Sequence, residues 1–127
     1  MDKIKFTREY SMKSVPVALL WTYLSTPSGL ENWFADTVKQ SGKQFTFGWN
    51  GNEQIAQLIS VRTYSYIRFH WVDEQDRSYF ELRIEVSELT DSIDLLVTDY
   101  SYPDELEESK ELWDNQIEAL QRNLGCL

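Results

Sequence analysis

Apolar and polar side chains alternate along most of the chain between residues 38 and 100. The clearest example runs from Phe80 to Val86, where apolar side chains occupy every second position and charged ones lie between them. A period of two is typical of strands that bury one face, and hairpin-length connections favour antiparallel pairing. The pattern therefore predicts an antiparallel sheet of about six strands, over residues 3–10, 45–49, 54–61, 67–71, 80–86 and 93–97.

Helical spacing is found in two other parts of the sequence. After Pro16, apolar residues recur every three or four positions up to Leu24, and a second, shorter piece follows the break at Thr26-Pro27. A longer amphipathic helix is predicted over residues 104–124, with one face formed by Leu106, Trp113, Ile117, Leu120 and Leu124. Because one face of a twisted sheet has to be covered, we expect this helix to lie across it in an α+β fold.

Length and composition fit one globular domain spanning residues 1–127. Of the 127 residues 42% are hydrophobic, which is enough for a core without disulfides or a metal ion. Twelve Lys and Arg residues stand against 21 Asp and Glu, and the formal charge of −9 disfavours binding to nucleic acid or to anionic membranes. No apolar run is long enough for membrane insertion, and the one cysteine, Cys126, cannot form an internal disulfide. The simplest interpretation is a cytoplasmic protein.

A series of short motifs in the first third of the chain carries a family resemblance. They are, in order, Ser14-Val15-Pro16-Val17, Leu20-Trp21, Leu24-Ser25-Thr26-Pro27, Gly29-Leu30 and Trp33-Phe34. Together with Trp71 and Trp113, this order resembles the helix-grip, START-like superfamily (SRPBCC), and particularly the Aha-type homologues related to activators of the heat-shock-chaperone ATPase. The resemblance implies a curved sheet wrapped around the C-terminal helix, with two short helices after the first strand. Lipid carriers, hormone receptors, cyclases and co-chaperones share this fold, which therefore leaves the function open.

A sheet that grips a helix tends to leave a cavity between the two, and the concave face expected here is almost entirely apolar. The residues expected to line it are Phe45, Phe47, Trp49, Ile67, Phe69, Trp71, Leu82, Ile84, Leu95, Val97, Asp99, Trp113, Ile117 and Leu120. We predict non-catalytic binding of a small hydrophobic or amphipathic ligand there, a use that the resemblance also implies. We expect no cofactor and no metal ion. The alternative is that these rings fill the volume as packed core.

Asp99 is the one charged residue in this set. It continues the alternation of Ile93, Leu95 and Val97, so a strand extended by two residues would turn its carboxylate inward, where burial raises a carboxyl pKa. The simpler interpretation is that the strand has ended and the carboxylate is solvated. His70 is out of phase with its apolar neighbours and is expected to face solvent. No nucleophile motif or phosphate-binding loop is present, and we assign no residue a catalytic role.

Two other functions stay open. A co-chaperone-like interaction domain would dock a basic protein partner, and its acidic patch would be Asp104, Glu105, Glu107, Glu108 and Glu111. A cyclase- or hydrolase-type enzyme would need polar groups inside the cavity, for which Asp99 is the one candidate. The chain is large enough to fold as a monomer, and we expect a monomer or a weak homodimer.

Overall fold

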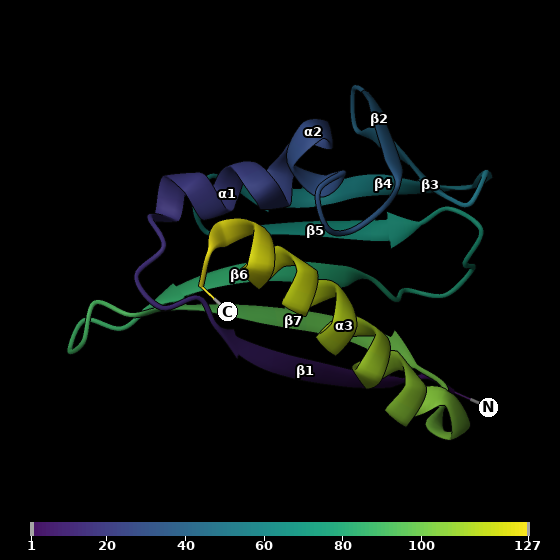
Figure 1. Ribbon diagram of the computed structural model, residues 1–127. Coiled ribbons are helices and arrows are strands. Elements are labelled where there is room, and N and C mark those ends of the chain that lie inside the picture. Colours follow the sequence, from purple (N-terminus) through teal and green to yellow (C-terminus); the bar gives the residue numbers. More distant parts are fainter. Residues whose placement is uncertain (1, 127) are drawn as a thin grey trace.

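The computed structural model describes residues 2–126, and its strands form one antiparallel sheet (Figure 1). Met1 and Leu127, the end residues of the expected domain, lie outside this range. The strands are β1 (Ile4–Ser11), β2 (Thr37–Ser41), β3 (Gln44–Trp49), β4 (Asn52–Arg62), β5 (Tyr66–Trp71), β6 (Phe80–Val86) and β7 (Ile93–Ser101). Their order across the sheet is β1-β7-β6-β5-β4-β3-β2, so the first strand pairs with the last.

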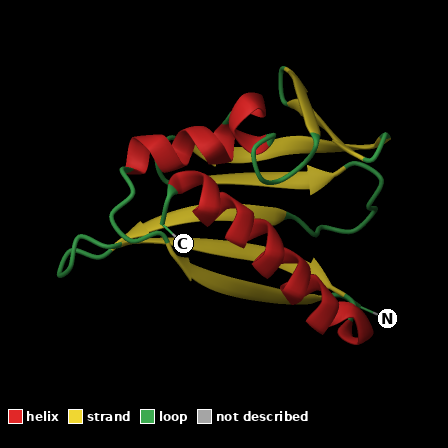
Figure 2. Cartoon of the chain, viewed as in Figure 1, coloured by secondary structure: helices red, strands yellow, loops and turns green. Residues whose placement is uncertain are grey.

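Helices cover one face of this sheet (Figure 2). Two short ones, α1 (Val17–Ser25) and α2 (Pro27–Leu30), follow β1, and a 3₁₀ turn, η1 (Pro103–Glu105), leads into the long α3 (Leu106–Leu124). In α3 the buried side chains are Trp113, Ile117 and Leu120, which pack into the same core as the concave face of the sheet. The predicted α+β, helix-grip architecture is confirmed.

The sheet has seven strands instead of about six, because the sequence pattern gave no sign of β2. Val38 is the one buried residue of this strand, so its sequence lacks the alternation that marks the others. β2 lies at an edge of the sheet and pairs with β3 alone among the described residues. A strand that is paired on one side and buried at one position leaves almost no periodic signal.

The turn after β3 and the end of α3 have backbone conformations that their residues favour. Asn50 and Gly51, with φ of 52° and 84°, form the tight turn between β3 and β4, where positive φ at both central positions matches the twist of a hairpin. At the end of α3, Gly125 has φ of 72°, and its N–H bonds back to the carbonyl of Arg122. The predicted stop of the long helix is therefore a left-handed glycine cap.

Polar contacts tie α3 to β1, the most distant strand in the sequence. The Asp114 carboxylate accepts hydrogen bonds from the guanidinium of Arg8, at 2.7 and 2.9 Å, and from the hydroxyl of Tyr10, at 2.6 Å. Burial alone would raise the pKa of Asp114, but the bonds from Tyr10 and Arg8 outweigh it and lower the pKa below its ordinary value. The charged pair is partly exposed, so it orients the helix and adds only modestly to stability.

Two leucines on α3 provide a direct test of this packing. Leu120 has no exposed surface, whereas Leu112 is 61% exposed. Leu120→Ala should lower the free energy of unfolding by about 3 kcal/mol, because it removes buried methyl groups and leaves a cavity. Leu112→Ala should change it by no more than about 0.5 kcal/mol. Urea unfolding followed by circular dichroism measures both, and equal losses would contradict the helix orientation described here.

Candidate ligand-binding cavity

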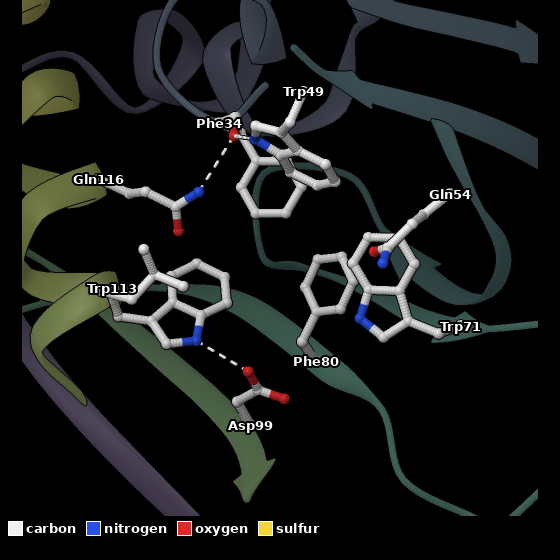
Figure 3. Close-up of a pocket in the computed structure, with 9 residues that line it drawn as sticks. Phe34, Trp49, Gln54, Trp71, Phe80, Asp99, Trp113 and Gln116 are labelled. Atoms are coloured by element: carbon white, nitrogen blue, oxygen red, sulfur yellow. Dashed lines mark hydrogen bonds between the residues drawn. The ribbon is translucent and has the colours of Figure 1, made fainter. Parts of the chain in front are cut away.

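A cavity of about 410 Å³ lies between α3 and the sheet (Figure 3). The strands β3 to β7, the segment after α2 and the middle turns of α3 all contribute to its lining. The residues that line it are Phe34, Trp49, Gln54, Trp71, Phe80, Asp99, Leu112, Trp113 and Gln116. Aromatic rings make up most of this surface, and three polar side chains interrupt it.

Five of these residues form a closed circuit of ring contacts, here called the five-ring cluster: Phe34, Trp49, Trp71, Phe80 and Trp113. Successive ring centroids around the circuit are 5.6, 6.1, 5.2, 6.0 and 5.8 Å apart. These separations fall in the range of favourable aromatic pairs. Each ring is therefore held by two neighbours, and the cavity surface is formed before any ligand arrives.

Phe34 holds a central position although it lies in an irregular segment. Its N–H bonds to the carbonyl of Leu30, which closes a turn directly after α2. Its own carbonyl accepts two hydrogen bonds, from the indole N–H of Trp49 at 2.9 Å and from the side-chain amide of Gln116 at 3.0 Å. One peptide group thus joins the sheet, the segment after α2 and α3 at the edge of the cavity.

The cavity is open to solvent along one side. Leu112 is largely exposed at its rim, Gln54 is exposed on β4, and Trp49 and Trp71 are half-buried. Gln116 and Leu112 also line a second, adjoining hollow of about 370 Å³ on the other side of Phe34. A small molecule can therefore reach the five-ring cluster without unfolding of the domain.

Asp99 points into the cavity, and the solvated carboxylate of the sequence interpretation is wrong. The reason is that β7 continues to Ser101 because β1 pairs with it over its whole length, with Phe6 opposite Asp99. The carboxylate accepts the indole N–H of Trp113 at 2.8 Å and the backbone N–H of Tyr100 at 2.7 Å. Burial is the dominant effect and raises its pKa from 3.8 to about 6, although these two bonds and the charge of Lys3 act in the opposite direction.

The fold and the cavity can be compared with those of known proteins. A family model for the START-like superfamily domain matches residues 1–126. The chain belongs to the START-like superfamily. This confirms the resemblance carried by the motifs between Ser14 and Phe34.

Solved structures share this fold. The solution structure of BfR322 from Bacteroides fragilis is 42% identical, covers 97% of this chain and 92% of that one, and has a TM-score of 0.70. The Aha1 dimer from Colwellia psychrerythraea is 12% identical, with 95% and 96% covered and a TM-score of 0.79. CalU16 from Micromonospora echinospora is 19% identical, with 98% and 74% covered and a TM-score of 0.69. No curated protein matches the chain.

The START-like domain uses only four of the fourteen expected residues to line the cavity: Trp49, Trp71, Asp99 and Trp113. The other ten are packed in the core, and the expectation that they line the cavity is wrong for Phe45, Phe47, Ile67, Phe69, Leu82, Ile84, Leu95, Val97, Ile117 and Leu120. In the middle of the sheet the phenyl rings meet edge to face, as Phe45 and Phe69 do at 4.9 Å, and fill the space. The cavity lies beyond them, beside Trp49, Trp71 and Trp113.

Five lining residues were missed from the sequence. Phe80 shares the parity of Leu82 and Ile84 and could have been included on that ground. Gln116 lies one helical turn from Trp113, and Gln54 lies opposite Phe47 in the pairing of β3 with β4. Leu112, beside Trp113, and Phe34, outside any strand, follow no such pattern. Within residues 2–126 no group of His, Cys, Asp and Glu is arranged to hold a metal ion, and no described helix is long and apolar enough to cross a membrane.

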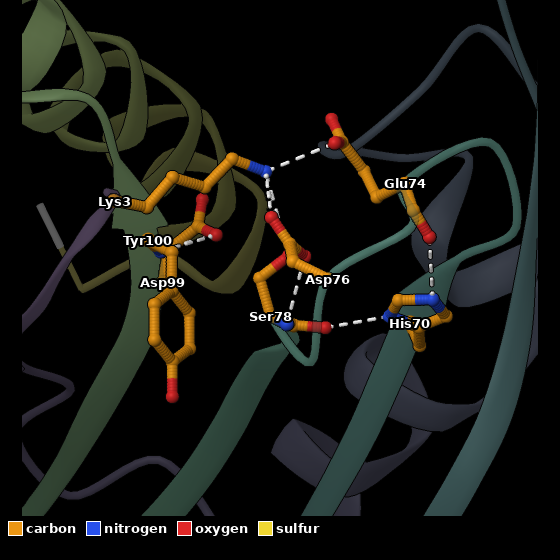
Figure 4. Close-up of polar contacts among 7 residues, drawn as sticks. All are labelled: Lys3, His70, Glu74, Asp76, Ser78, Asp99 and Tyr100. Carbon is orange, nitrogen blue, oxygen red and sulfur yellow. Dashed lines mark hydrogen bonds and ion pairs between the residues drawn. The ribbon is translucent and has the colours of Figure 1, made fainter. Parts of the chain in front are cut away.

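A cluster of polar and charged groups lies near Asp99, beyond the end of the cavity (Figure 4). The Lys3 ammonium pairs with Glu74 and Asp76, each at 3.0 Å, and so binds the connection between β5 and β6 to the start of β1. The expectation that His70 faces solvent is wrong, because this connection folds back over the end of β5. Both ring nitrogens of His70 contact carbonyl oxygens there, of Ser78 at 2.6 Å and of Glu74 at 3.0 Å.

The raised pKa of Asp99 predicts a pH-dependent stability. Folding favours its protonated form, so this contribution is fully present below about pH 4 and is lost as the pH rises through about 6. Asp99→Asn removes the titration. Relative to this variant, the wild type should lose about 2 kcal/mol of unfolding free energy between about pH 4 and pH 7. Urea unfolding of both proteins across this range measures the difference, and parallel curves would show that the carboxylate is not buried.

Proposed function

We propose that this START-like domain binds a small hydrophobic or amphipathic molecule, without catalysis, in the cavity between the sheet and α3. The observation that carries the proposal is the volume of about 410 Å³ that the five-ring cluster lines together with four other residues. Small-molecule sites in proteins span roughly 300–1,000 Å³ and are mainly apolar with a few placed polar groups. The cavity has this size and this kind of surface.

The packed-core alternative is less well supported. A fully packed core would leave no volume able to admit even one water molecule, whereas about 410 Å³ remains between α3 and the sheet. The indole N–H groups of Trp49 and Trp113 are bonded to Phe34 and Asp99, so what these rings offer to the cavity is mainly apolar surface. The rings are also fixed by their mutual contacts, which lowers the entropic cost of binding.

An enzymatic role has one supporting feature, the raised pKa of Asp99. A carboxyl group titrating at about 6 is suited to proton transfer near neutral pH. Acid–base chemistry commonly needs a second positioned group, however, and Asp99 is the only ionisable side chain among the nine that line the cavity. We therefore favour binding over catalysis.

An interaction with a basic protein is the other candidate. The acidic side chains of η1 and the first turns of α3 are exposed, and of these only Glu107 has an ion-pair partner within residues 2–126, Lys110 at 3.7 Å. The same charges also complement the helix dipole, so they have a structural purpose without any partner. Capture of a basic protein at low salt and its release at high salt would favour this second function.

The proposal includes a cytoplasmic location and a monomeric or weakly dimeric state. The single cysteine, Cys126, is a free thiol and is buried, in keeping with a reducing compartment. Sedimentation at two protein concentrations measures the oligomeric state.

Two glutamines on β4 allow a test of the cavity. Gln54 lines it, whereas Gln57 is exposed on the opposite face of the same strand. The neutral fluorescent probe N-phenylnaphthylamine should bind the wild type saturably, quench tryptophan emission and raise the melting temperature. Gln54→Phe fills part of the cavity and should weaken binding by about tenfold, whereas Gln57→Phe should leave it unchanged. Equal affinity in all three proteins would contradict binding at this site.

A further inference from the structure

The charge in the cavity lining is of one sign, negative. Of the nine lining residues, Asp99 is charged, and among the residues that the structure describes no Lys, Arg or His joins it in the lining. A carboxylate offers about four lone-pair sites, and the bonds from Trp113 and Tyr100 use one on each oxygen. Asp99 therefore keeps acceptor capacity on both oxygens for a further donor.

The charges behind Asp99 do not offset it. An adjoining hollow of about 190 Å³ shares Asp99 and Trp71 with the main cavity and is also lined by Lys3, Glu74 and Glu105. Lys3, at the start of β1, is already paired with Glu74 and Asp76. Glu74 comes from the connection between β5 and β6, and Glu105 comes from η1. The groups that face Asp99 from these elements thus leave a net negative potential, in a chain whose formal charge is −9.

The rings reinforce this preference for positive charge. The face of an aromatic ring is the negative side of its quadrupole, and a cation within about 6 Å of the centroid is attracted to it. The positive edge of Trp49, its indole N–H, is bonded to the Phe34 carbonyl, and that of Trp113 is bonded to Asp99. Trp49 and Trp71 line the cavity, are half-buried and have centroids 6.1 Å apart, so one cationic group in the cavity can contact both rings.

We infer that the ligand of this cavity carries an ammonium group on an apolar or aromatic body, with the cation held between the five-ring cluster and the Asp99 carboxylate. This inference rests on the proposed function and names the chemical class of the ligand. It excludes fatty acids and other anionic amphiphiles, since the Asp99 carboxylate repels them and no lining side chain among the described residues would neutralise their charge.

Three probes of similar size separate the possibilities. The first is phenylethyl-trimethylammonium, and the second is its neutral isostere, in which a tert-butyl group replaces the trimethylammonium. The third is the anion phenylbutyrate. Isothermal titration at about pH 8 should give an affinity for the cation at least about tenfold above that for the isostere, with phenylbutyrate weaker than both. At about pH 5, where Asp99 is protonated, the advantage of the cation should be lost, while the isostere binds as before.

Two variants of β7 make the test specific. Asp99→Asn should abolish the preference for the cation. Asp94→Asn removes the same charge from the same strand on the opposite face, away from the cavity, and should leave the preference intact. A third variant, Leu112→Lys, places a positive charge at the exposed rim of the cavity and should weaken binding of the cation more than binding of the isostere.

The outcomes are distinct. Equal affinity of the wild type for cation and isostere, or a cation preference that survives in Asp99→Asn, would overturn this inference and leave the proposed function standing. Tighter binding of phenylbutyrate would overturn it as well. Failure of both the isostere and N-phenylnaphthylamine to bind would instead overturn the proposed function, and the inference with it.

Discussion

The ring of Phe34 lies between α3 and the sheet, stacked at 5.8 Å on Trp113 of the helix and at 5.5 Å on Phe80 of β6. Protein interiors are packed as densely as organic crystals, so α3 cannot approach the sheet here unless this ring is expelled. Expulsion is opposed because the Phe34 carbonyl accepts hydrogen bonds from Trp49 of the sheet and from Gln116 of α3. The volume beside Phe34 is therefore a fixed feature of the fold.

Most of the fold followed from rules that act over a few residues. The alternation from Phe80 to Val86, the Asn50–Gly51 turn and the apolar face of α3 each specify local structure, and each is found as expected. The strand and helix signals are strong because one face of each element is buried, and the turn signal is strong because its two residues tolerate positive φ. β2 was not predicted because Val38 is its one buried residue, so its sequence shows no alternation of apolar and polar positions.

The cavity was harder to predict from the sequence, because residues far apart in the chain come together to form it. Asp99 faces inward because β1 extends β7, which depends on residues more than ninety positions earlier in the chain. Whether a ring such as Phe69 or Trp71 lines a space or fills it depends on the neighbours that sheet twist places beside it. Phe34 lies in an irregular turn, where no period exists. The sequence thus indicated the concave face and its aromatic character, but not where packing stops.

The strand order also determines when this domain can fold. β1 is made first, yet at one edge of the described sheet its neighbour is β7, with Ile4 opposite Ser101, and its Arg8 reaches Asp114 of the last helix. During synthesis β1 stays unpaired until nearly the whole chain has left the ribosome, whereas the hairpins from β2 to β6 can form earlier. Until α3 emerges, the part of the concave face that packs against Trp113, Ile117 and Leu120 stays uncovered. A nascent or truncated chain that ends before α3 is therefore the form of this protein most prone to aggregation and most dependent on chaperones.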